Sequence, residues 1–244
     1  MPTVNDPRTL LQAAVEFHQA GELARAAQLY ERVLRLSPAD PDALHLFGLV
    51  RHQQGAHAEG AAYIRRAVDL IPDNPVLRSN LGDALRRAGE PRAAIEQLRV
   101  ALALRPDHAG THLNLGAAYG DIHAHEAALR HAEEAARLAP ELAEAHYNLG
   151  RALFDQLRLE DAVVAFRAAL RRRPDYPAAV DNLLYLLNLI PGLDPWEVAA
   201  EHRRVCGHLD HLARPPRKAP GGRPDRLLRI GYVSRDFRAH AVNY

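Results

Sequence analysis

Four asparagines are spaced so that their side chains could act together on one ligand. Asn80, Asn114, Asn148 and Asn182 follow one another at intervals of 34 residues. A carboxamide offers both a hydrogen-bond donor and an acceptor, so it can pair with the N–H and C=O groups of any peptide backbone. The equal spacing predicts a ladder of amides that holds an extended protein or peptide. The alternative is that asparagine was copied when the repeated unit duplicated.

Histidine raises the separate possibility of a metal site, because the chain contains 14 histidines. His123 and His125 share one predicted turn, and His202 precedes Cys206 by four residues on a predicted helix. Zinc requires three or four converging ligands whose orientation is fixed by further hydrogen bonds. Neither pair supplies that number, so we predict no metal site.

The asparagines belong to a longer pattern with the same period. Proline recurs every 34 residues, at positions 38, 72, 106, 140 and 174. In units that begin at residues 7, 41, 75, 109 and 143, the eighth residue is always small: Ala14, Gly48, Gly82, Gly116 and Gly150. A strict period of this length is typical of stacked helix-turn-helix units.

The recurring small residues have a packing explanation. A glycine inside a helix costs about 1 kcal/mol relative to alanine, so its recurrence at one position implies a compensating contact. Helices pack with their axes roughly 8 to 10 Å apart, and the short end of that range requires small side chains at the crossing. The eighth residue, with small residues at the twentieth and twenty-seventh positions, therefore predicts a closed helical hairpin in each unit.

The asparagines occupy the sixth position of their units, on the first predicted helix. An α-helix advances about 100° per residue, so this position lies about 200° from the fourth and eighth positions and points away from the buried face. Neighbouring first helices should be roughly 10 Å apart, and an extended peptide advances about 3.3 Å per residue. Each amide would then meet about every third residue of a bound segment.

These registers resemble those of the tetratricopeptide repeat family. The resemblance implies an all-α, right-handed superhelical solenoid whose first helices line its concave side. Residues 7–190 would form the solenoid. It would consist of five repeats followed by a terminal half-repeat, and the five repeats would span residues 7–40, 41–74, 75–108, 109–142 and 143–176. Some repeats of this family clamp the acidic C-terminal tail of a chaperone with lysines and asparagines. The absence of lysine before Lys218 argues against that function.

After the repeats, the sequence predicts a connecting helix over residues 191–213 and a linker over residues 214–226. Asp194, Pro195 and Glu197 form a helix start signal. Trp196 would anchor this helix on the end of the solenoid. The linker is rich in proline and glycine and has no apolar face, which indicates a domain boundary.

The last segment changes pattern, because LLRIGYVS has the short apolar run of a strand. After the repeats and the proline-rich linker, LRIGYVSRDFRAHAVNY resembles the opening of the catalytic region of the protein O-GlcNAc transferase family. The resemblance implies the first strand of a Rossmann-like glycosyltransferase domain and a catalytic role for His240. Family members usually carry proline where this chain has Ala241. The complete enzyme would transfer sugar from a UDP-sugar donor to Ser or Thr of proteins.

Residues 227–244 would be only the truncated start of that domain. Three or more strands are generally needed for a stable sheet. We therefore expect this segment to be poorly ordered, and the chain as given to bind no cofactor and to transfer no sugar. The sequence leaves open whether the repeats serve such an enzyme. The alternative is a stand-alone tetratricopeptide scaffold for protein–protein interaction.

Composition narrows the remaining function classes. The chain of 244 residues carries 31 basic and 30 acidic side chains, so no net field attracts it to nucleic acid or to anionic lipid. No apolar run reaches the roughly 20 residues that cross a bilayer, and the N-terminus has no apolar secretory core. The single cysteine, Cys206, is typical of a reducing compartment. The sequence thus predicts a cytoplasmic protein with no nucleic-acid or membrane partner.

Overall fold

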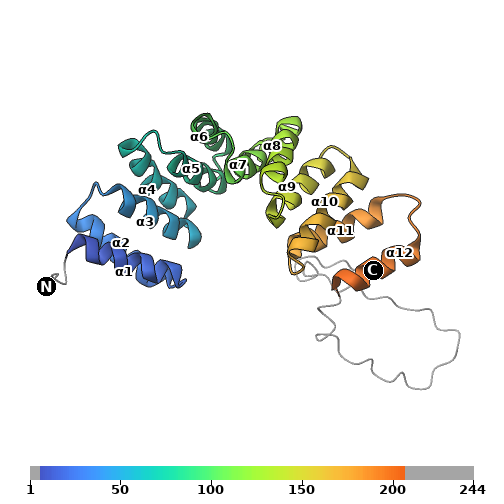
Figure 1. Ribbon diagram of the computed structural model, residues 1–244, viewed down its shortest axis with the longest axis horizontal. Helices are drawn as coiled ribbons and strands as arrows, with labels where there is room; N and C mark the ends of the chain where they lie inside the picture. Colours follow the sequence, from blue (N-terminus) through green and yellow to red (C-terminus); the bar gives the residue numbers. More distant parts are fainter. Residues whose placement is uncertain (1–5, 207–244) are drawn as a thin grey trace, which may run out of the picture. The chain divides into compact units, whose positions relative to one another are not determined.

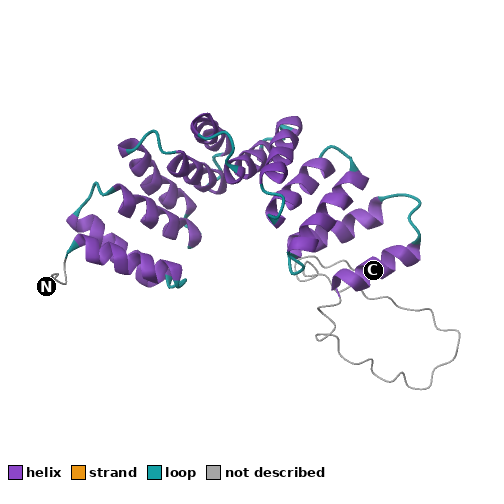
Figure 2. Ribbon diagram, viewed as in Figure 1, coloured by secondary structure: helices purple, strands orange, loops and turns teal. Residues whose placement is uncertain are grey.

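The computed structural model describes residues 6–206, which form α-helices joined by short turns, with no strand in this range (Figures 1 and 2). This confirms the predicted all-helical fold. The helices are α1 (Pro7–Gln19), α2 (Leu23–Leu36), α3 (Pro41–Gln53), α4 (His57–Leu70), α5 (Pro75–Arg87), α6 (Pro91–Leu104), α7 (Ala109–Asp121), α8 (His125–Leu138), α9 (Ala143–Phe154), α10 (Leu159–Arg172), α11 (Pro177–Leu189) and α12 (Pro195–Cys206). His240, the predicted linker and the predicted strand lie outside the described residues.

The helices pair into hairpins that follow one another along the chain (Figure 1). Each odd-numbered helix from α1 to α9 packs on the even-numbered helix after it, and that helix packs on the next odd-numbered one. The odd-numbered helices from α1 to α9 also contact one another directly, each touching the next. We call α1, α3, α5, α7, α9 and α11 the first-helix layer. All four asparagines of the predicted ladder lie in this layer.

Glycine at the eighth position brings the two helices of a hairpin close together. In the second hairpin, a Cβ atom at Gly48 would lie 2.8 Å from the carbonyl oxygen of Gly60, and one at Gly60 would lie 2.6 Å from that of Gly48. A Cβ atom at Gly150 would lie 2.7 Å from the ring of Phe166. Because no side chain fits at these crossings, close packing offsets the poor helix propensity of glycine.

The helices of the first-helix layer begin differently along the chain. The first four have side-chain caps that accept hydrogen bonds from the backbone of the first turn: Asp6, Asp40, Asn74 and His108. Leu142 and Tyr176 stand at the same position before α9 and α11, and neither provides a side-chain cap. The last two helices therefore lack a contribution that is typically about 1 kcal/mol per helix.

The turn inside each hairpin contains one residue with left-handed backbone geometry. In the first three hairpins this residue is Gly21, Gly55 or Gly89, with φ of 76°, 86° and 86°. In the next two it is His123 or Leu157, both with φ of 59°. Left-handed geometry costs an ordinary L-residue about 1–2 kcal/mol, so the fourth and fifth turns are strained and the first three are not.

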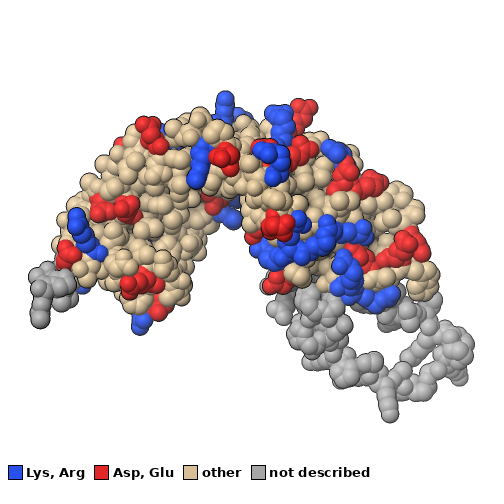
Figure 3. Space-filling view, in the orientation of Figure 1, with Lys and Arg blue, Asp and Glu red and all other residues tan. Residues whose placement is uncertain are grey.

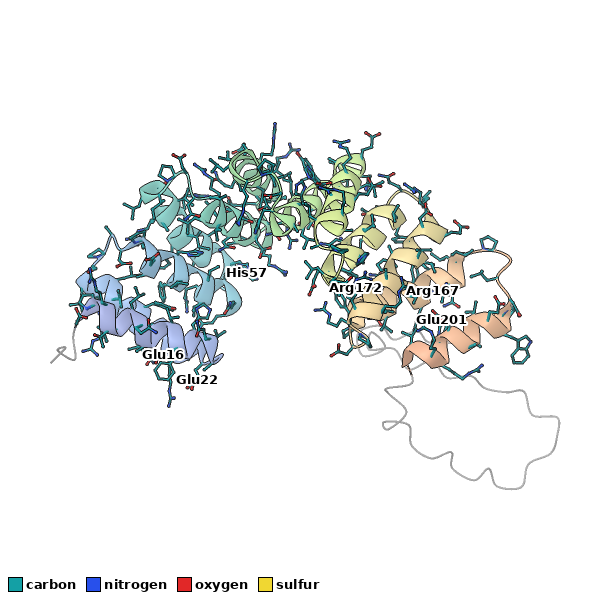
Figure 4. The ribbon with its side chains drawn as sticks, in the orientation of Figure 1. Glu16, Glu22, His57, Arg167, Arg172 and Glu201 are labelled. Carbon is teal, nitrogen blue, oxygen red and sulfur yellow. The ribbon has the colours of Figure 1, made fainter. Side chains whose placement is uncertain are left out.

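The connecting helix α12 is held by an ion-pair cluster. Glu201 pairs with Arg167 of α10 at 2.9 Å and with Arg204 at 2.8 Å (Figure 4). The hydrogen bond from Arg204, together with that from Arg167, outweighs burial and lowers the pKa of Glu201 to about 2. The predicted anchoring role of Trp196 is wrong, because its side chain is 79% exposed. The part of the predicted connecting helix after Cys206 lies outside the described residues.

Candidate functional site

The four asparagines of the predicted ladder are half-buried, on α5, α7, α9 and α11, but they are not equivalent. The side-chain nitrogen of Asn80 lies 2.8 Å from Nε2 of His45, on the preceding first helix. The side-chain nitrogen of Asn182 donates to the hydroxyl of Tyr147 at 3.3 Å. Neither Asn114 nor Asn148 has a hydrogen-bond partner for its side chain within residues 6–206. Two of the four amides are therefore free for a ligand.

The residue 35 positions earlier decides whether an amide is occupied. Both bonded pairs have this separation, and the earlier residue stands at the fifth position of the preceding repeat. For Asn114 that residue is Ser79, whose hydroxyl instead accepts a hydrogen bond from Thr111 at 3.0 Å. For Asn148 it is Leu113, which has no polar group. The apolar side chain of Leu113 thus explains why Asn148 is free, whereas Ser79 is bonded to Thr111 and not to Asn114.

Further bonds between repeats close the N-terminal part of the first-helix layer. His18 on α1 lies 3.1 Å from Gln53 on α3, and Arg86 on α5 donates to Asp121 on α7 at 3.2 Å. Asp83, on α5, lies 3.2 Å from His52 on α3. Burial raises the pKa of Asp83, but the hydrogen bond to His52 and the nearby arginines outweigh burial, so the net shift is downward. The polar groups of this part are largely engaged with one another.

The C-terminal part of the layer presents more unengaged groups. Arg151 on α9 is exposed, and no hydrogen bond or ion pair involves its side chain within the described residues. Tyr185 on α11 is 57% exposed, and its ring lies edge-on to Phe154 with the centroids 6.2 Å apart. Figure 3 shows arginine side chains gathered over α9 to α11 on the face in view. The sequence places Arg151 near the asparagines, whereas sequence reasoning missed Tyr185, although both residues stand at the ninth position of their units.

Two pairs of histidines lie close together in the described residues. Nδ1 of His52 lies 3.1 Å from Nδ1 of His57, and Nδ1 of His112 lies 3.0 Å from Nδ1 of His131. Burial, together with the nearby His112, lowers the pKa of His131 to about 4, so its ring is neutral at pH 7. Within the described residues, no three histidine, cysteine or acidic side chains converge as metal ligands would.

Comparison with known proteins identifies the repeated unit. Family models of the tetratricopeptide repeat match residues 11–75, 82–122 and 143–176. The solenoid of this chain is therefore built from tetratricopeptide repeats, as the spacing of its small residues and prolines predicts. These three models describe the repeat and not a glycosyltransferase domain. A comparison with curated proteins found no match.

Solved structures support the same fold. PilW, a widely conserved type IV pilus biogenesis factor, has a TM-score of 0.71 at 17% identity, over 84% of this chain and 92% of its own. TTC0263, a thermophilic TPR protein of Thermus thermophilus, has a TM-score of 0.62 at 21% identity, over 75% and 100%. YrrB, a TPR protein with an unusual peptide-binding site, has a TM-score of 0.57 at 22% identity, over 73% and 92%. Such identities show the fold alone.

The sequence predicts no membrane partner, because it contains no apolar run long enough to cross a bilayer. Among the helices between residues 6 and 206, none combines the length and the apolar character that a bilayer crossing demands.

Proposed function

We propose that this chain is a protein-binding scaffold that holds an extended segment of a partner protein along its first-helix layer. The observation that carries the proposal is the pair of free amides, Asn114 and Asn148, at one position of two helices in contact. Neither side-chain amide is sealed from solvent, so a ligand can reach both, and a bound peptide backbone would supply both a donor and an acceptor. The stand-alone scaffold is therefore the function that we favour.

The geometry suits an extended chain. α7 and α9 are in direct contact, which sets their axes roughly 10 Å apart. An extended segment that crosses them would meet an amide about every third residue, since it advances about 3.3 Å per residue. In tetratricopeptide solenoids the first helices line the concave side, so we propose that the partner lies in that groove, in the cytoplasm.

The second candidate function is that of the substrate-selecting part of a protein O-GlcNAc transferase-like enzyme. The sequence of residues 228–244 favours it, with His240 as the proposed catalytic residue. This segment lies outside the described residues, and the matching family models cover only repeats. Incubation of the chain with radiolabelled UDP-GlcNAc and a Ser/Thr-containing peptide tests it. Donor-dependent labelling of the peptide, lost in His240→Ala, would support this function over the scaffold.

The scaffold function is tested with peptides that the chain itself selects. A displayed library of random peptides is enriched on the full chain, and the affinity of an enriched peptide is measured by fluorescence anisotropy. Replacing both Asn114 and Asn148 with alanine should weaken binding about tenfold or more, because each lost hydrogen bond is worth about 1 kcal/mol.

The matched control replaces Asn80 and Asn182 with alanine. The side-chain nitrogens of these amides bind His45 and Tyr147 within the chain, so the control should lower thermal stability and change peptide affinity less than about threefold, since each amide is held in the orientation that its internal bond requires. Equal losses of affinity in the two double variants would contradict the assignment of Asn114 and Asn148 as the binding pair.

A further inference from the structure

The helix that carries Asn148 also carries an arginine without an ionic partner. Arg151 lies three residues after Asn148, so the two side chains share one side of α9. The acidic residues of this region do not neutralise it. Glu144 binds Arg173 at 2.6 Å, and Asp155 lies 4.0 Å from His125.

One further acidic group lies on the next helix of the layer. Asp181 on α11 is exposed and forms no ion pair within the part of the chain that the structure describes. Arg151 thus stands beside a free amide, with no carboxylate of the described residues within ion-pair distance. An exposed guanidinium of this kind offers a planar array of donors that matches a carboxylate in two parallel hydrogen bonds.

The surroundings of Arg151 suit a segment that continues onto the next helix. Tyr185 stands at the equivalent position of α11, 34 residues later, and is 57% exposed. Tyrosine combines a large apolar ring with a polar hydroxyl, which makes it effective at protein interfaces.

We propose that the surface formed by Asn114, Asn148, Arg151 and Tyr185 selects a partner segment that carries an aspartate or glutamate side chain. The two amides hold the segment's backbone, Arg151 pairs with its carboxylate, and Tyr185 contacts the residues that follow. This inference rests on the proposed scaffold function, which requires only the backbone grip. It differs from capture of a C-terminal carboxylate, because the acidic group belongs to a side chain within an extended segment.

The test uses a phage-displayed library of random peptides about twelve residues long, twice the roughly six residues that span two spacings between first helices. Peptides enriched on the full chain should be rich in Asp and Glu. The same selection on Arg151→Glu should lose that enrichment and favour Lys and Arg, because the charge of the site is reversed.

Affinities of one enriched acidic peptide and its Asn- or Gln-substituted form then isolate the ion pair. Arg151→Met should weaken binding of the acidic peptide roughly three- to tenfold and leave the neutral form within about twofold, as expected for a partly exposed ion pair. The matched control is Arg171→Met, which removes another exposed arginine from α10 and should leave both affinities within about twofold. Circular dichroism at 222 nm establishes that each variant keeps its helical content.

The outcomes separate the two proposals. If the wild-type chain enriches no peptide, the scaffold function itself fails. If it enriches peptides without acidic residues, or if Arg151→Met weakens the acidic and neutral peptides equally, the selection of a carboxylate is overturned while the scaffold function stands.

Discussion

The first three repeats and the last two differ in how their first helices begin and in which residue forms the turn of the hairpin. In the first three, each first helix has a side-chain cap and each turn has glycine at the left-handed position. In the fifth repeat, Leu142 replaces the cap and Leu157 replaces the glycine. The two free amides and the unpaired Arg151 lie in the fourth and fifth repeats. Local rules are thus obeyed where the first-helix layer is closed by its own bonds, and broken where we propose that a partner binds.

This difference has a consequence for stability, because each repeat contacts only its neighbours. The stability of such a protein is approximately a sum of repeat and interface contributions. The strained turns of the fourth and fifth repeats and the missing cap of the fifth should therefore make these two repeats the weaker part of the stack. Variants that exchange glycines, turn residues and caps between the two parts test this difference.

The largest effect is expected at the hairpin crossings. A Cβ atom at Gly60 would lie 2.6 Å from the backbone oxygen of Gly48, whereas one at Gly116 would lie 3.3 Å from the oxygen of Ala128. Gly60→Ala should lower the free energy of unfolding by about 3 kcal/mol, because backbone must move to admit the methyl group. Gly116→Ala should change it by less than about 1 kcal/mol, since improved helix propensity offsets the milder contact. Urea unfolding followed by circular dichroism measures both, and equal losses would contradict the crossing geometry.

The turn residues should give opposite effects in the two parts of the chain. Leu157→Gly should raise the free energy of unfolding by about 1 kcal/mol, because glycine adopts left-handed geometry without strain. Leu157 is 80% exposed, so the substitution loses little packing. Gly89→Ala, at the equivalent position of the third repeat, should lower the free energy of unfolding by about 1 kcal/mol. Thermal unfolding of the two variants compares them, and a loss of stability in Leu157→Gly would show that the turn is not strained.

The helix caps can also be exchanged between the two parts, by adding a cap before α9 and removing the cap of α3. Leu142→Asp should raise the free energy of unfolding by roughly 0.5–1 kcal/mol, because its carboxylate can accept from the uncapped first turn of α9. Asp40→Ala removes the cap of α3, where the Asp40 carboxylate accepts from the backbone of Ala43 at 2.9 Å, and should cost a comparable amount. Amide hydrogen exchange in the first turns of α3 and α9 follows the two changes. Slower exchange in α9 without slower exchange in α3 is expected for Leu142→Asp.

The smallest effect concerns the attachment of α12. The pKa of Glu201 is about 2, below its ordinary value of 4.5. Its ion pairs therefore contribute fully above pH 4.5 and are lost as the pH falls through about 2. Because Arg167 and Arg204 are 42% and 60% exposed, the contribution is about 1 kcal/mol or less. Glu201→Gln should speed amide exchange in α12 at pH 7 and have a much smaller effect near pH 2, where much of Glu201 is protonated. An equal effect at both pH values would exclude an ionic attachment.

The sequence alone predicts most of the fold, because the fold depends on features that repeat. Proline and glycine at fixed intervals specify where helices end and where they cross. In the structure, the second helix of each hairpin ends two residues before the recurring proline, as α2 does at Leu36 and α4 at Leu70. The asparagines were likewise placed on first helices from their register. These inferences use only one residue position at a time, together with the helical period.

Which amides are free depends on a second spacing, of 35 residues, which the 34-residue period does not show. Asn80 is bonded because His45 stands 35 residues earlier. Asn148 is free because the residue 35 positions before it is Leu113, which has no polar side-chain group. Ser79 stands 35 residues before Asn114 but is bonded to Thr111 and not to Asn114. Contacts between repeats depend on such pairs, and a pattern within one repeat does not contain them. The exposure of Trp196 shows the same limit, since an aromatic residue at a helix start does not say what it will meet.

Whether Asn114 and Asn148 are the binding amides is tested most directly by observing all four asparagine side chains in one experiment. Two-dimensional ¹⁵N–¹H NMR spectra of the full chain resolve side-chain NH₂ signals, and single Asn→Gln variants assign them. On titration with an enriched peptide, the signals of Asn114 and Asn148 should shift to saturation. Those of Asn80 and Asn182, held by His45 and Tyr147, should stay nearly unchanged. Equal shifts at all four residues, or unshifted signals of Asn114 and Asn148 at saturating peptide, would contradict the division of the first-helix layer into a closed and an open part.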